Sequence, residues 1–172
     1  NLVGFDKETI LKYHLMFHIT GTDTFMYRKE LLMEIGGFDP IDIGDEYYLM
    51  HKTIMSGAKI GYFPGCDIVA YVHSGGGGLS TGLNKIIGEN FLYDFKKQYF
   101  SVLSSKEKRY INFRHYAVLT YANLKIGNYI QMVVNGVVAI LCSPIEALKA
   151  ISSAIRLIAL TSKTKGRFLH GS

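Results

Sequence analysis

Two adjacent glycines and, a few residues later, two adjacent acids mark the most informative stretch of this chain. Glycine adopts backbone conformations in which other residues are strained, so Gly36 and Gly37 predict a tight turn. Beyond Asp45 and Glu46, apolar residues recur at helical spacing, which places these acids near the start of a predicted helix. The apolar positions are Leu49, Met50, Ile54 and Met55. Because negative charge is favoured at a helix N-terminus, the acids fit either N-capping or a functional site.

Further motifs flank this stretch in a fixed order. They are Thr20-Gly21-Thr22, Tyr27-Arg28-Lys29-Glu30-Leu31-Leu32, Ile35-Gly36-Gly37-Phe38-Asp39, Gly44-Asp45-Glu46, Gly57-Ala58-Lys59-Ile60-Gly61-Tyr62-Phe63-Pro64 and Val72-His73. In this succession, the chain from about residue 14 to residue 100 resembles the second half of a family 2 glycosyltransferase with the GT-A fold. The resemblance implies an α/β fold, the C-terminal, acceptor-side half of a GT-A nucleotide-sugar transferase, followed by a helical tail. That tail resembles those of bacterial surface-polysaccharide members.

The acid pair of this family is usually Glu followed by Asp, and the second acid is commonly the base that deprotonates the acceptor hydroxyl. The order is reversed in this chain. Aligning Leu49 and Lys52 with the family's Leu and basic residue puts Glu46 in the base position, with Asp45 as the second choice. A carboxylate base contributes about 10²–10⁴ in rate. The resemblance therefore implies transfer of a sugar from a nucleotide-sugar donor to a glycan or lipid-linked acceptor, with inversion.

A divalent metal is the cofactor that the resemblance implies. Family members neutralise the departing nucleoside diphosphate with Mg²⁺ or Mn²⁺ held by an Asp-x-Asp motif. That motif belongs to the first half of the family's domain, so we expect the main metal ligands to precede this chain. His73 follows the apolar run 68–72, and the resemblance implies that it ligates the metal or contacts the diphosphate. A histidine that merely closes a strand is the alternative.

The resemblance also implies residues that bind the substrates. Thr22 and Asp23 lie in a predicted strand over 22–27 and are candidates for hydrogen bonds to acceptor hydroxyls. Arg28 is a candidate partner of the diphosphate, with a structural ion pair to Asp39 as the alternative. Lys52 occupies the family's basic position and completes this set.

A run of glycines at 75–78 resembles the mobile loop that closes over nucleotide or acceptor in the family. Gly75, Gly76 and Ser80 are its candidate substrate contacts. On composition alone the run is a flexible loop. It matches neither a Walker motif nor a dinucleotide-binding fingerprint.

A polar break at 101–105 divides the chain into a predicted acceptor and catalytic half, residues 1–100, and a helical subdomain, residues 101–172. Helices are predicted from Lys106 until Gly127, over 129–141 and over 145–160. Their predicted apolar faces are Tyr110, Phe113, Ala117, Tyr121 and Leu124 on the first, and Leu148, Ile151, Ile155 and Ile158 on the third. The run 129–145 is short for a membrane span and contains polar residues, so buried packing explains it better.

The net charge of the chain limits the classes of partner that it is expected to bind. With 19 Lys and Arg against 14 Asp and Glu, the net charge of +5 suits a nucleotide diphosphate, a lipid diphosphate or an anionic membrane surface. No nucleic-acid-binding motif is present, so nucleic acid is not an expected partner. The third helix and the basic residues Lys163, Lys165 and Arg167 fit a segment on a membrane surface, with a buttressing helix bundle as the alternative.

Cysteine usage agrees with a reducing compartment. Cys66 and Cys142 are far apart and show neither zinc-site nor disulfide spacing. We therefore expect a cytoplasmic protein. The third helix and the basic residues after it further predict peripheral attachment to the inner face of the cell membrane.

A function of a different class also fits the sequence, namely a non-catalytic glycan-binding or assembly module derived from a transferase half. The reversed acid pair and the missing Asp-x-Asp favour this module. Glu46, His73, Arg28 and the glycine-rich loop favour the enzyme. As half of a domain, the chain is expected to be inactive alone and to self-associate through its uncovered surface.

Overall fold

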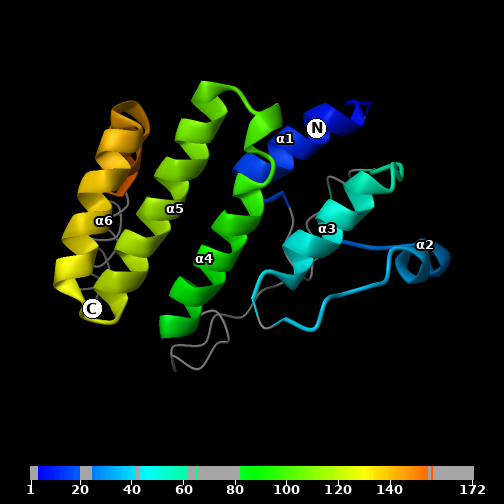
Figure 1. Cartoon of the computed structure of the whole chain (residues 1–172), viewed down its shortest axis with the longest axis horizontal. Helices are drawn as coiled ribbons and strands as arrows, with labels where there is room; N and C mark the ends of the chain where they lie inside the picture. Colours follow the sequence, from blue (N-terminus) through cyan, green and yellow to red (C-terminus); the bar gives the residue numbers. More distant parts are fainter. Residues whose placement is uncertain are drawn as a thin grey trace, which may run out of the picture.

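The computed structural model of this chain describes residues 4–19, 25–41, 43–61, 65, 82–154 and 156. Within these ranges the chain forms helices joined by turns and extended segments, and it contains no β-strand (Figure 1). The helices are α1 (Lys7–Phe17), α2 (Lys29–Glu34), α3 (Asp45–Met55), α4 (Gly82–Lys97), the 3₁₀ helix η1 (Phe100–Val102), α5 (Ser105–Lys125) and α6 (Tyr129–Cys142). Residues 144–154 are also helical.

The predicted α/β architecture, the acceptor-side half of a GT-A fold, is wrong, because no described part of the chain belongs to a sheet. Only residues 25–27 of the strand predicted over 22–27 are described. They belong to neither a helix nor a strand. A strand forms only where a second one takes its backbone hydrogen bonds. Instead, the Tyr27 hydroxyl donates to Thr53 Oγ1 on α3 at 2.8 Å, and Thr53 donates to the Leu49 carbonyl at 2.9 Å. The second predicted strand, 68–72, lies outside the described residues.

Capping interactions define both ends of α1. Asp6 accepts a hydrogen bond from the Thr9 backbone N–H at 2.9 Å and caps the start of the helix. At the other end, His18 adopts the left-handed conformation with φ of 53°, and its N–H donates to the His14 carbonyl at 3.0 Å. The buried residues of α1 are Ile10, Leu11, His14 and Leu15. This buried face packs against α3 and α5.

The predicted turn and the helix that follows it are confirmed. Gly36 and Gly37 both have positive φ, 80° and 61°, which a residue with a side chain rarely adopts. The helix α3 then begins at Asp45, as the apolar spacing predicted. Its predicted apolar face is buried at Leu49, Met50 and Ile54. Met55 is 41% exposed, so the predicted face is wrong at its last position.

Three long helices, α4, α5 and α6, run side by side with alternating direction (Figure 1). The helix α5 starts with a capping box, in which Ser104 accepts from the Glu107 backbone N–H and Glu107 accepts from the Ser104 backbone N–H. It ends just before Gly127, which has φ of 76°. These bounds confirm the predicted helix, but its predicted face is wrong at Tyr121 and Leu124, which are exposed. The buried residues are Ile111, Phe113, His115, Leu119, Ala122 and Asn123.

A close approach brings α4 against the loop that precedes α3. A Cβ atom at Gly88 would lie 2.5 Å from Ile43 Cγ2, well inside van der Waals contact. Only glycine leaves room for the Ile43 side chain at this position. The contact therefore fixes α4 beside the start of α3.

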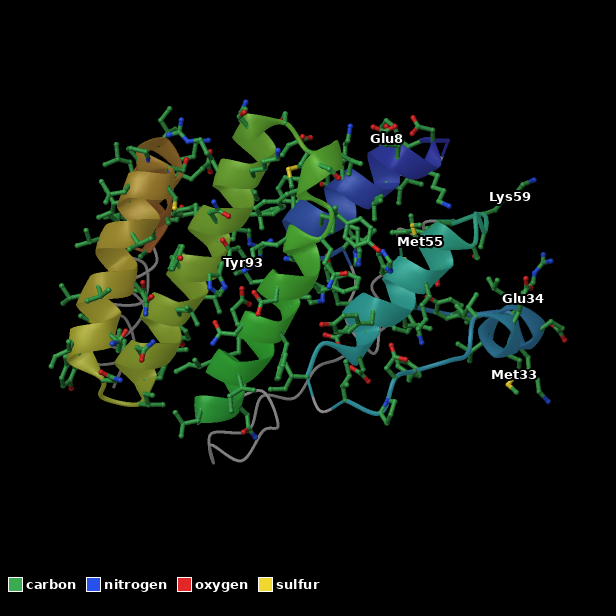
Figure 2. The ribbon with its side chains drawn as sticks, in the orientation of Figure 1. Glu8, Met33, Glu34, Met55, Lys59 and Tyr93 are labelled. Carbon is green, nitrogen blue, oxygen red and sulfur yellow. The ribbon has the colours of Figure 1, made fainter. Side chains whose placement is uncertain are left out.

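The helix α2 lies at the periphery. None of its residues is buried, and Met33 and Glu34 lie at the far end of the molecule from α6 (Figure 2). Tyr93, by contrast, lies where α4 faces α5 (Figure 2). The principal core joins α1, α3, α4 and α5 through Ile10, Leu11, Leu15, Tyr47, Met50, Ile54, Leu92, Leu103 and Ile111.

The helix α6 buries only Asn135 and Ala139, so the predicted buried packing of the run 129–145 is wrong for most of its length. The following helix also exposes two residues of its predicted apolar face, Leu148 at 68% and Ile151 at 50%. The Ile155 side chain and residue Ile158 lie outside what the structure describes, as do Lys163, Lys165 and Arg167. Among the described residues, no helix combines the length and apolarity needed to span a bilayer.

Candidate functional site

The start of α3 meets the end of α1 and gives the two predicted acids different surroundings. The Asp45 carboxylate accepts a hydrogen bond from the Glu46 backbone N–H at 2.9 Å and so helps to start the helix. The Glu46 carboxylate instead lies near His18, with 3.6 Å between Glu46 Oε1 and His18 Nε2. The Glu46 side chain is 20% exposed, so it is accessible to a ligand. Gly44 is the N-cap residue of α3, Asp45 contacts the backbone of the first turn, and Glu46 faces the histidine.

His18 is an uncharged neighbour for Glu46 at neutral pH. Burial, together with the positive charges of Lys96, Arg114 and Lys85, lowers the pKa of His18 to about 4. Its left-handed backbone is the one positive φ among the described residues other than glycine. Such a conformation is uncommon outside glycine, and here it ends α1 as its C-cap.

The second histidine of α1, His14, is fully buried and packs on Tyr47. Their ring centroids are 4.1 Å apart and nearly parallel, and His14 Nε2 lies 3.0 Å from the Tyr47 carbonyl. Because a carbonyl can only accept, Nε2 carries the proton and Nδ1 is left as a bare acceptor. Burial lowers the pKa of His14 to about 3, so the ring is neutral. Burial likewise raises the pKa of the Tyr47 hydroxyl.

Lys96 on α4 brings a positive charge to the ring of Tyr47. The side chain is 8% exposed, and its Nζ lies 5.2 Å from the centroid of the Tyr47 ring. Burial lowers the pKa of Lys96 to about 8, so the amine remains mostly protonated at pH 7. Within the described part of the chain, no carboxylate lies within ion-pair distance of this ammonium.

Several buried polar atoms in this region make no hydrogen bond within the described structure. They are His14 Nδ1, His18 Nε2, Tyr47 Oη and His51 Nε2. All belong to one aromatic cluster, in which Tyr47 contacts both His14 and His18 and Phe95 joins Tyr47 to His51. Buried polar groups normally have partners, so such a gathering offers hydrogen-bonding groups to a ligand or to ordered water.

Two predicted substrate-binding residues are described, and neither lies in this cluster. Lys52 Nζ donates to Asp39 Oδ1 at 2.6 Å and to the Gly37 carbonyl at 3.1 Å, so it holds the glycine turn against α3. This ion pair takes the place of the Arg28–Asp39 pair considered from sequence. Arg28 is exposed and precedes α2 as its N-cap residue.

The structure does not describe the remaining predicted site residues. Thr22, Asp23, His73, Gly75, Gly76 and Ser80 all lie outside the described residues. The described ranges also contain no group of His, Cys, Asp and Glu side chains suited to a metal ion. His73, the metal ligand predicted within this chain, lies outside the described residues, so the Mg²⁺ or Mn²⁺ that the resemblance implies stays a prediction.

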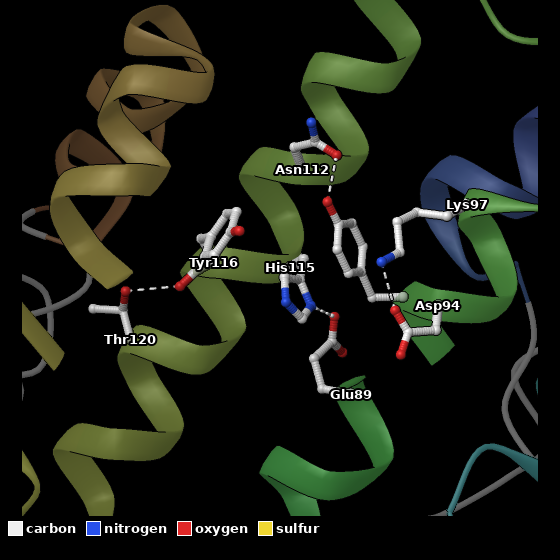
Figure 3. Close-up of polar contacts among 8 residues, drawn as sticks. Glu89, Asp94, Lys97, Asn112, His115, Tyr116 and Thr120 are labelled. Atoms are coloured by element: carbon white, nitrogen blue, oxygen red, sulfur yellow. Dashed lines mark hydrogen bonds and ion pairs between the residues drawn. The ribbon is translucent and has the colours of Figure 1, made fainter. Parts of the chain in front are cut away.

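A separate polar cluster joins α4 to α5 (Figure 3). His115 is 5% exposed, stacks on Tyr93 with centroids 3.9 Å apart, and lies with Nδ1 3.3 Å from Glu89 Oε1. The Tyr93 hydroxyl donates to Asn112 Oδ1 at 2.9 Å. Because its atoms are paired within the cluster, we interpret it as a structural clamp between the helices.

Sequence reasoning missed His14, His18 and Lys96. The signal for the histidines was their spacing of one helical turn beside apolar residues, but that pattern is equally typical of a core face. Nothing in the sequence around Lys96 distinguishes it from the exposed Lys97.

Comparisons of the chain with protein-family models, curated proteins and solved structures found no match. The fold and site define a helical protein with a carboxylate beside a neutral histidine and a buried, positively charged amine.

Proposed function

We propose that this chain is part of an inverting glycosyltransferase in which Glu46 is the general base. The observation that carries the proposal is the placement of the Glu46 carboxylate at the start of α3, 3.6 Å from His18. Negative charge is favoured at a helix N-terminus, which favours the ionised form needed in a base. The succession of motifs around the acids supplies the reaction class.

The reaction needs a base whose carboxylate is ionised, so that it can accept a proton. Glu46 would take the proton of an acceptor hydroxyl as that oxygen attacks the anomeric carbon, while the bond from this carbon to the nucleoside diphosphate breaks. Attack from the face opposite the leaving group inverts the configuration. His18 supports this role because its neutral imidazole does not cancel the carboxylate charge. The metal ion, Mg²⁺ or Mn²⁺, remains an expectation from the resemblance.

The test is release of nucleoside diphosphate from a panel of nucleotide sugars, with Mg²⁺ or Mn²⁺ and with glycan and lipid-linked acceptors. The protein is used in its full encoded length, with the metal ion supplied in the assay. We expect Glu46→Gln to lower turnover by about 10²–10⁴-fold. Asp45→Asn is the matched control, with its effect confined mainly to stability.

The outcomes separate the alternatives. Loss of turnover in Asp45→Asn but not in Glu46→Gln would move the base to Asp45. Glycan binding without turnover from any donor would contradict the enzyme and support the non-catalytic glycan-binding module.

We also propose that the protein works at the cytoplasmic face of a membrane, with α6 against the lipid. This helix contains no charged residue. Its exposed apolar side chains are Tyr129, Ile130, Val133, Val134, Val137, Ile140 and Leu141. An exposed apolar patch of this kind marks a contact with a membrane or a protein, and Lys125 and Arg156 supply positive charge in the sequence that flanks α6.

Sedimentation with lipid vesicles tests this placement. Wild-type protein is expected to bind vesicles that contain anionic lipid more strongly than neutral vesicles. Ile130→Glu should weaken binding, because residue 130 is 77% exposed on α6. Met33→Glu is the control, since Met33 is 72% exposed on the distant α2. Equal binding by both variants would contradict the proposal, and light scattering shows whether self-association covers the face instead.

A further inference from the structure

A buried positive charge without a carboxylate partner is the feature that the proposed base does not explain. Lys96 is more than nine-tenths buried, yet the described structure gives its ammonium only the face of the Tyr47 ring at 5.2 Å. Burying a charge is costly unless it is paired, and a cation–π contact recovers only part of that cost. The neighbouring Lys97 is different, because it lies near the surface and pairs with Asp94 at 2.6 Å.

Other positive charges surround the same place. Arg114 on α5 donates from Nη1 to the Met16 carbonyl at 2.9 Å, which holds its guanidinium beside the end of α1. Its charge acts on both Lys96 and His18. Lys85, on the same face of α4 as Lys96 by helical periodicity, also acts on His18. Positive groups of three side chains thus converge near the proposed base.

Two carboxylates, those of Glu89 and Glu46, face these three positive charges and leave one positive charge in excess. Glu89 acts on Lys96 and His18 from α4, but its carboxylate is engaged with the buried ring of His115 at 3.3 Å. Glu46 lies by His18. The buried polar atoms His18 Nε2 and Tyr47 Oη, which make no hydrogen bond within the described structure, lie in the same cluster. The surroundings therefore suit a ligand that brings negative charge and oxygen atoms.

We propose that Lys96, with Arg114, binds the diphosphate of a substrate beside Glu46. A phosphate oxygen would take the place of the missing carboxylate at the Lys96 ammonium, and the guanidinium would contribute a second charged donor. Lys85 would add attraction for the approaching anion. This inference rests on the proposed function for its choice of diphosphate. The source of that group is either the nucleotide donor or a lipid diphosphate acceptor.

The first experiment measures binding of inorganic pyrophosphate to the full chain by calorimetry and by the shift of the melting temperature. The variants are Lys96→Met and, as the matched control on the next residue of the same helix, Lys97→Met. We expect Lys96→Met to weaken pyrophosphate binding by about ten- to a hundredfold, the worth of a hydrogen bond to a charged group. Lys97→Met should bind as the wild type does.

The melting temperature without ligand separates binding from packing. Removal of an unpaired buried charge should leave the melting temperature of Lys96→Met unchanged or raised. A lowered melting temperature together with unchanged pyrophosphate binding would overturn the inference and make Lys96 a packing residue. Absence of pyrophosphate binding to the wild type would also overturn it.

Two further ligands identify the source of the diphosphate. Binding of uridine diphosphate that depends on Lys96 would assign the site to the donor, and Lys96-dependent binding of farnesyl diphosphate would assign it to a lipid acceptor. Glu46→Gln keeps this inference separate from the proposed function, since it should lower turnover by about 10²–10⁴-fold and retain pyrophosphate binding. Binding through Lys96 without turnover from any donor would refute the transferase and leave the diphosphate site standing.

Discussion

His14 is bound to Tyr47 twice, by ring stacking with centroids 4.1 Å apart and by its Nε2–H, which donates to the Tyr47 carbonyl at 3.0 Å. These contacts lock α1 to α3 at the position where the proposed base lies. They also fix the neutral form of the ring, because the side chain has no exposed surface on which a second proton could be hydrated. The stability of the α1–α3 junction should therefore depend on pH.

We predict that the protein loses stability as the pH falls below about 6.5. Burial lowers the pKa of His14 to about 3 and that of His18 to about 4, so between these values and 6.5 the unfolded chain binds protons that the folded chain does not. Stability consequently rises with pH in this window and falls on acidification. Between pH 6.5 and 4.5, each histidine should cost about 2–3 kcal/mol. Urea unfolding at these two pH values measures the loss.

His14→Phe is the control for this prediction. Phenylalanine keeps a ring against Tyr47 but does not titrate, so the variant should lose about half as much stability as the wild type between pH 6.5 and 4.5. An unfolding free energy that is the same at both pH values in the wild type would contradict neutral, buried histidines.

We predict that Gly88→Ala destabilises the protein even though alanine is the better helix former. The new Cβ would lie 2.5 Å from Ile43 Cγ2, so either Ile43 or α4 must move, at a cost of about 1–3 kcal/mol. Gly136→Ala in α6 is the matched control, because its nearest neighbour, Thr120, is at 3.7 Å. That change should stabilise by up to about 1 kcal/mol. Thermal unfolding of both variants checks the sign, and equal shifts would contradict the close approach at residue 88.

We predict that Lys52→Met weakens the glycine turn. Lys52 bonds both Asp39 and the Gly37 carbonyl, but Asp39 is 38% exposed, so solvent screening limits the loss to about 1 kcal/mol. Lys59→Met is the control, since Lys59 is exposed on the loop after α3. Chemical denaturation measures the stability of both variants. A Lys52→Met protein with unchanged stability but weakened nucleotide-sugar binding would instead support the substrate-binding role predicted from sequence.

Features with local causes were predictable from sequence, and those with tertiary causes were not. The helix between Lys106 and Gly127 was predicted because a serine-rich break and a glycine bound it locally, and α3 because its apolar residues repeat at helical spacing. Which face of α5 is buried depends on α4 and α6, and the prediction for Tyr121 was wrong for that reason. Strand formation likewise requires a partner, which the described part of the chain does not provide at 25–27.

In the candidate site too, features with local causes were predictable from sequence and features with tertiary causes were not. Asp45 and Glu46 were identified because a helix start is a local feature of sequence, whereas their different surroundings follow from His18, which approaches from another helix. Lys96 could not be distinguished from Lys97 because burial is decided by packing against Tyr47. Residues outside the described ranges, His73 among them, stay predictions.

We predict that His115 and Glu89 are strongly coupled. Their side chains are 5% and 12% exposed and meet at 3.3 Å, while the His115 ring also stacks on Tyr93 (Figure 3). His115→Phe keeps a ring on Tyr93 but removes the hydrogen-bond partner of the buried Glu89 side chain, which should cost about 1–3 kcal/mol. Glu89→Gln alone should cost less, because an amide is cheaper to bury than a carboxylate. In the double variant the losses should not add, and the coupling energy from urea unfolding of all four proteins should reach about 0.5–3 kcal/mol. Additive losses would show that the stack on Tyr93, and not the contact with Glu89, holds His115 between α4 and α5.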